Sequence, residues 1–146
     1  MLLPWLVLLH VLGATVWVGG HLVLAVTILP KALKEKSVRG IQVFEQHFER
    51  IGIPALLLQV ITGIWMAMLF VPFNDWLSLA SAHHRLLWIK LTLLLATIGL
   101  AIHARFFIVP RLTPERLPSL AFHIVLVTVL AVSFVLTGLS FRFNFY

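Results

Sequence analysis

The sequence has no cysteine among its 146 residues, and charged residues make up only 11% of it. The lack of cysteine excludes disulfides, iron–sulfur clusters and thiolate metal sites, so that imidazole, carboxylate, amine and thioether groups remain as ligands. The few acidic residues fall in connections between apolar runs or at predicted helix ends. The sequence shows no nucleophile motif, phosphate-binding loop or carboxylate pair, which argues against hydrolytic chemistry.

Hydrophobic residues make up 61% of the chain, whereas a soluble domain is about half apolar and about a quarter charged. Four apolar runs stand out, at about residues 4–29, 51–71, 86–109 and 117–139. Each has the roughly 20 residues that a helix needs to cross a bilayer. The sequence therefore predicts an all-α integral membrane protein, an up-down four-helix bundle that forms a single transmembrane domain over residues 1–146.

Basic residues gather in two of the three connections between these runs. Residues 31–50 and 105–116 carry most of them, while residues 72–84 contain no Lys or Arg. The positive-inside rule places the two basic connections in the cytoplasm and both termini in the periplasm of a bacterial inner membrane. The net charge of +6 is thus explained by topology, and we expect a lipid bilayer as partner and no nucleic acid.

Proline and polar residues predict where the helices begin and end. Pro30, Pro72 and Pro110 are expected to mark helix ends, because proline disrupts a helix interior. Pro54 falls in the first turn of the second run, where proline is tolerated. Residues 38–50 form a partly polar pattern that predicts a helix running on into the second span.

Ionisable residues inside the spans are the main functional signal. They are expensive in a bilayer and usually face the bundle interior, so each is a functional hypothesis: His10, His21, His103, His123 and Lys90. A helix rises 1.5 Å per residue, which puts His21, His103 and His123 in one layer, roughly 6 to 10 Å to the cytoplasmic side of the midplane. His10 and Lys90 fall in the outer half.

Imidazoles at matched depth on facing helices are what a bis-histidine b-type haem requires. One or two haems are expected, an inner one held by two of the three inner histidines and an outer one held by His10 with a histidine at the outer mouth. Trp17 lies near the shared face of the first helix. The candidate cofactor-binding residues are His10, His21, His103, His123, His83, His84, Lys90 and Trp17. The first four of them are also candidate metal ligands.

These residues leave several functions open. A haem protein would transfer electrons between a quinol or a small oxidant and another redox protein, with or without enzymatic oxidoreductase activity. A histidine cluster that binds copper(II) is an alternative. In a third reading, the histidines are hydrogen-bonding residues between helices, and the protein is a structural subunit of a respiratory complex. Each reading is compatible with a homo-oligomer.

Several motifs carry a family resemblance over nearly the whole chain. They are the stretch from His10 to Gly20 with its Trp-Val-Gly-Gly, the segment His47–Ile51 followed by Thr62-Gly63, the segment Leu86–Leu91, and His103-Ala104-Arg105 followed by Pro110. In these motifs the chain resembles the CopD family of bacterial membrane proteins. That resemblance implies copper uptake or resistance in the inner membrane, beside a periplasmic copper protein, with copper in place of haem.

A second, more distant resemblance rests on two residues. An early histidine in the first span, His10, and an early lysine in the third, Lys90, are similar to those of HemJ-type protoporphyrinogen oxidases. This resemblance implies a small helical membrane protein linked to haem.

Overall fold

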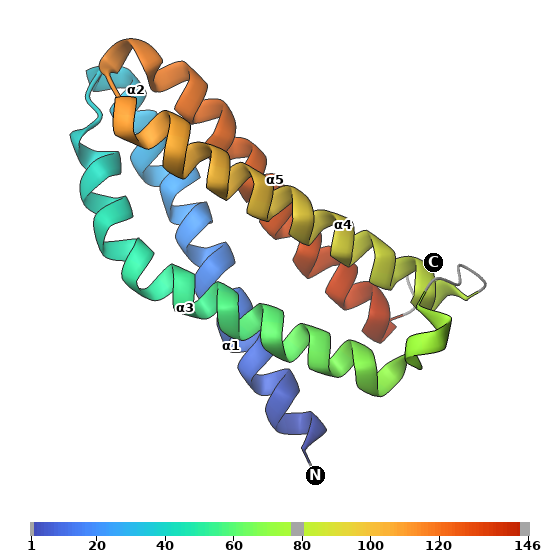
Figure 1. Cartoon of the computed structure of the whole chain (residues 1–146). Helices are drawn as coiled ribbons and strands as arrows, with labels where there is room; N and C mark the ends of the chain where they lie inside the picture. The colour runs from blue at the N-terminus through green and yellow to red at the C-terminus, as the bar shows by residue number, and fades with distance from the viewer. Residues whose placement is uncertain (1, 77–80, 144–146) are drawn as a thin grey trace.

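The computed structural model describes residues 2–76 and 81–143, the last three of them by their backbone alone. Within these ranges every regular element is helical, which confirms the all-α prediction (Figure 1). Four helical stretches are long and apolar enough to cross a membrane, so the chain is a multi-pass membrane protein. The main helices are α1 (Leu3–Val23), α3 (Arg39–Phe70), α4 (Ala82–His103) and α5 (Leu117–Phe143).

The first span does not end at Pro30, contrary to the prediction. α1 passes into a π-helical segment, η1 (Leu24–Ile28), and then into α2 (Leu29–Glu35), where Pro30 lies in the first turn. A proline lacks an amide hydrogen and crowds the carbonyl four residues earlier, and a wider π turn accommodates both effects. The helix ends only at Lys36, whose φ of 49° is the left-handed conformation that commonly closes a helix.

The third span also widens into a π turn, but it ends at Arg111, next to Pro110 as predicted. After α4, a π-helical segment, η3 (Ala104–Ile108), leads into a short 3-10 turn, η4 (Val109–Arg111), which contains Pro110. Pro114 opens a further 3-10 turn before α5 begins. Both spans that precede a basic connection therefore widen into a π turn shortly before a proline.

α3 is a single helix of 32 residues, which confirms that residues 38–50 continue into the second span. Pro54 lies well inside it rather than in a first turn. Figure 1 shows α3 clearly bent, and we attribute the bend to Pro54, because an interior proline breaks one backbone hydrogen bond. α3 ends at Phe70, two residues before Pro72, as predicted.

The helices pack in the order α3, α1, α5, α4. α1 packs extensively against α3, α4 packs against α5, and α1 joins the two pairs through α5, whereas α3 and α4 make few contacts with each other. Glycines allow the close approach of α1 and α3. A Cβ on Gly13 would lie 2.8 Å from the carbonyl oxygen of Ala55, and Phe48 packs against both Gly20 and Gly52. The bundle is thus closed on one side and open between α3 and α4.

The core is concentrated at one end of the bundle. This end carries residues 31–39 and 111–116, which are parts of the two basic connections, and is called the basic end below. The largest buried cluster lies there and comprises Leu24, Leu29, Ala32, Ile41, Ile108, Leu117, Leu120 and Ile124. Many large apolar side chains outside this cluster point outward, as Val26 and Leu95 do with 70% exposure each. Such a surface suits contact with lipid.

Candidate functional site: the groove between α3 and α4

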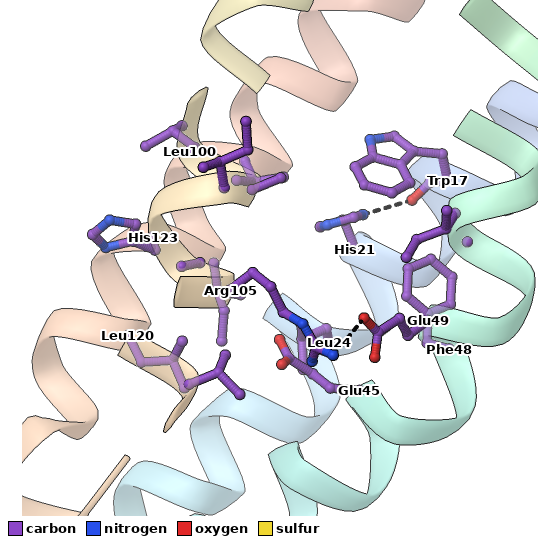
Figure 2. Close-up of a pocket in the computed structure, with 18 of the residues that line it drawn as sticks. Trp17, His21, Leu24, Glu45, Phe48, Glu49, Leu100, Arg105, Leu120 and His123 are labelled. Carbon is purple, nitrogen blue, oxygen red and sulfur yellow. Dashed lines mark hydrogen bonds and ion pairs between the residues drawn. The ribbon is translucent and has the colours of Figure 1, made fainter. Parts of the chain in front are cut away.

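A cavity of about 320 Å³ lies on the open side of the bundle, between α3 and α4. We call it the groove (Figure 2). Its walls are mostly apolar and include residues from both π-helical segments, such as Leu24 and Phe106. Its polar residues are Trp17, His21, Glu45, Glu49, Arg105 and His123. The cavity falls within the range of roughly 300–1,000 Å³ that is usual for small-molecule sites.

His21 projects into the groove from α1 (Figure 2). Its Nδ1–H donates to the backbone carbonyl of Trp17 at 2.8 Å, so the neutral ring carries its lone pair on Nε2. The ring packs beside Trp17, with centroids 4.4 Å apart, and meets the edge of Phe48 at 5.6 Å. A fixed tautomer, with the second nitrogen bonded to a backbone carbonyl, is typical of histidines that ligate metals.

Trp17 contributes a hydrogen-bond donor that is not satisfied. The residue is only 8% exposed, and its Nε1–H has no hydrogen-bond partner within the described part of the chain. Leaving a buried polar group unpaired costs about 1–3 kcal/mol, and lipid chains offer it no acceptor.

The groove becomes charged toward the basic end. Glu49 Oε1 lies 3.3 Å from Arg105 Nη2, so this ion pair connects α3 to the segment that follows α4. Glu45 lies one turn before Glu49 and also lines the groove. From the sequence, both acids were expected in a connection or at a helix end and were not among the candidate site residues. Their spacing was the available signal, since Glu45 and Glu49 share one helical face with Phe48 and Gly52.

His103 and His123 are brought together at the contact of α4 and α5. His123 Nδ1–H donates to the carbonyl of Ser119 at 2.9 Å, so its Nε2 accepts the 3.0 Å hydrogen bond from His103 Nδ1–H. Both nitrogens of His123 are thereby engaged. Although His123 borders the groove, Figure 2 shows its ring on the far wall, turned away from His21. His103 lies on an exposed face, beside Phe107.

His10 lies outside the groove, in the contact of α1 and α3. Its Nδ1–H is shared between the carbonyl of Gln59 and Oγ1 of Thr62, both at 3.0 Å. Its ring covers Gly63, where a Cβ would lie 3.1 Å from the ring carbon Cε1. This histidine is therefore bound to the neighbouring helix.

The remaining candidates lie toward the end of the bundle opposite the basic end. His83 and His84 are in the first turn of α4, and Nδ1 of His84 is buried with no hydrogen-bond partner among the described residues. Lys90 Nζ lies 3.7 Å from the position that a Cβ on Gly138 would occupy. It is thus directed from α4 toward α5.

The family model described as copper resistance protein D matches residues 42–141, which is more than half of the chain. The chain belongs to the CopD family. Searches among curated proteins and solved structures found no match. The matched segment of this CopD-family chain begins in α3, so Glu45, Glu49, Arg105 and the pair His103–His123 lie inside it. Trp17 and His21 precede it.

This CopD-family protein does not gather its candidate ligands into a ready metal cluster. Among the residues that the structure describes, no group of three or more His, Asp or Glu side chains could hold a metal ion. The imidazoles occur singly, as His21 does, or as the pair His103–His123. An ion bound by this arrangement would need further ligands from a cofactor, water or another molecule.

Proposed function

We propose that this CopD-family protein is a membrane redox protein that binds b-type haem in the groove, with His21 as an axial ligand. One observation carries the proposal: the hydrogen bond from His21 Nδ1 to the carbonyl of Trp17, which directs a fixed Nε2 lone pair into an apolar cavity. Histidine nitrogen is a common axial ligand of haem iron.

The donor set favours haem over a bare metal ion as the resident group. A porphyrin supplies four nitrogen ligands of its own and needs only one or two from the protein. Within the described part of the chain, the groove offers one imidazole nitrogen that is not hydrogen-bonded, Nε2 of His21. The aromatic rings of Trp17 and Phe48 and the aliphatic wall suit a flat apolar ring. When bound, haem would supply one-electron transfer.

Charged residues at the end of the groove would orient the cofactor. Arg105 is positioned there by Glu49, and a guanidinium binds carboxylates in a bidentate manner. Arg105 would thus bind a propionate group of the haem at the basic end.

The proposal also includes an orientation and partners. We place the protein in a bacterial inner membrane, with the basic end in the cytoplasm and both termini in the periplasm. A quinol dissolved in the bilayer, or another redox protein, would exchange electrons with the haem. The open side between α3 and α4 supports access from the lipid.

The first experiment is to purify the protein in detergent, record its oxidised and dithionite-reduced visible spectra, and measure metals in the same sample. We expect haem absorbance and iron in the wild type and in His47→Ala, and neither in His21→Ala. His47 is the matched control, because its Nδ1 bonds a carbonyl four residues earlier at 2.7 Å on an exposed surface. A wild-type protein without colour or iron would refute the proposal.

Copper handling is the second candidate function, and family membership favours it. Copper would then be a substrate rather than a resident cofactor. The pair His103–His123 offers two imidazoles for it, a ligand type that suits copper. This candidate predicts a colourless protein that binds copper in stoichiometric amounts and loses it in His103→Ala. A colourless protein without any metal would instead favour a structural subunit.

A further inference from the structure

The groove offers an axial ligand from one wall only. His21 Nε2 enters it from α1, while the opposite wall, formed by α4 and α5, is aliphatic around Leu100, Ala101 and Val127. Among the residues that the structure describes, His123 is the only other imidazole that borders the groove. The position of His123 therefore decides whether the protein could supply a second histidine ligand to a bound haem.

His123 is not available as a second ligand in this conformation. Its Nδ1–H donates to Ser119, and its Nε2 accepts from His103. Ligation of a metal would require it to give up at least one of these hydrogen bonds and to turn toward His21. His103 lies outside the groove on an exposed face, and His10 is bound to α3. Neither of these two can replace it.

We infer that the protein supplies a single axial imidazole, and that the groove is a binding site for a small neutral diatomic molecule at the other face of the haem. The inference rests on the proposed function. The sequence predicts ligation by two histidines. The structure favours one, because both ring nitrogens of His123 are hydrogen-bonded. An open coordination position would make the protein a ligand-binding haem protein in addition to an electron carrier.

The chemistry of the groove determines the class of that molecule. The wall opposite His21 has no hydrogen-bond donor among the residues Leu100, Ala101 and Val127, so a bound anion would lack a partner there. Neutral diatomic molecules dissolve well in hydrocarbon, and the open side between α3 and α4 gives them a route from the bilayer interior.

Carbon monoxide is a suitable probe, because it binds ferrous haem only where a coordination position is open or easily vacated. We expect the reduced wild-type protein to show a high-spin spectrum without split α and β bands. It should bind one carbon monoxide per haem, with a shift of the Soret band. The variant His123→Ala should give the same spectra and the same stoichiometry, since His123 is not a ligand.

The opposite pattern would overturn the inference. In that case the wild type is low-spin with split bands and does not bind carbon monoxide, while His123→Ala becomes high-spin and binds it. The wild-type spectrum alone decides the question if His123→Ala fails to fold. A colourless wild type would overturn the proposed function and this inference together, whereas a low-spin haem would overturn the inference alone.

Discussion

Two histidines of α1 have different surroundings, because one lies on the closed side of the bundle and the other on the open side. His10 and His21 are eleven residues apart and share a face of α1, yet the ring of His10 bonds groups of α3, while the ring of His21 bonds a carbonyl of its own helix. The difference lies in what faces each ring. His10 covers Gly63, which lets α3 approach, whereas the bulky ring of Phe48 packs beside His21. Equal spacing in sequence therefore does not imply an equal role.

The largest expected effect separates these two histidines. His21→Ala should lose all haem, whereas His10→Ala should retain one haem per chain, because His10 lies outside the groove and serves packing. Haem-to-protein ratios from the absorbance of purified variants measure this. If His10→Ala loses haem while its folding is intact, the closed side also binds a cofactor, and the comparison fails.

A moderate effect is expected where the closed side is tightest. Gly13→Ala would place a Cβ 2.8 Å from a backbone oxygen of α3, and overpacking of this kind costs about 1–3 kcal/mol. The control is Gly99→Ala, where nothing lies within 4 Å of the added Cβ. Thermal unfolding in detergent should show a lower midpoint for the first variant only. Equal midpoints would mean that α1 and α3 are not closely packed.

The smallest effect is expected on the open side. Arg105 and Glu49 are 60% and 37% exposed, and an exposed ion pair contributes at most about 1 kcal/mol. Glu49→Gln should therefore shift the unfolding midpoint little. The variant should leave haem binding by His21 in place. A large loss of stability in Glu49→Gln would show that the ion pair, rather than the contacts of α1, holds α3 and α4 in position.

The sequence predicted the helices well, because a bilayer leaves the backbone few choices. Residues that cross lipid must satisfy their hydrogen bonds within the chain, so length and apolar character sufficed for four helices. The polar segment 38–50 was also predicted as part of a helix. The expected end at Pro30 was wrong, since a π turn keeps the chain helical to Glu35.

The arrangement of the site was harder to predict for a physical reason. The rise per residue gives the depth of a side chain but not which neighbouring helix faces it. Depth placed His21, His103 and His123 in one layer, while the structure pairs the latter two and places His21 on another wall. Which helices approach closely depends on small residues such as Gly20 and Gly52, and on contacts between the first and last helices.

The packing order α3, α1, α5, α4 also has a consequence for biogenesis. α1 with α3 and α4 with α5 are hairpins of neighbouring segments, each able to form while the chain is being inserted. The contact of α1 with α5 joins the first helix to the last, and such distant contacts close late. We therefore expect the groove to be absent from the nascent chain and to arise only when α5 has entered the membrane. Cofactor loading would then be a step that follows synthesis.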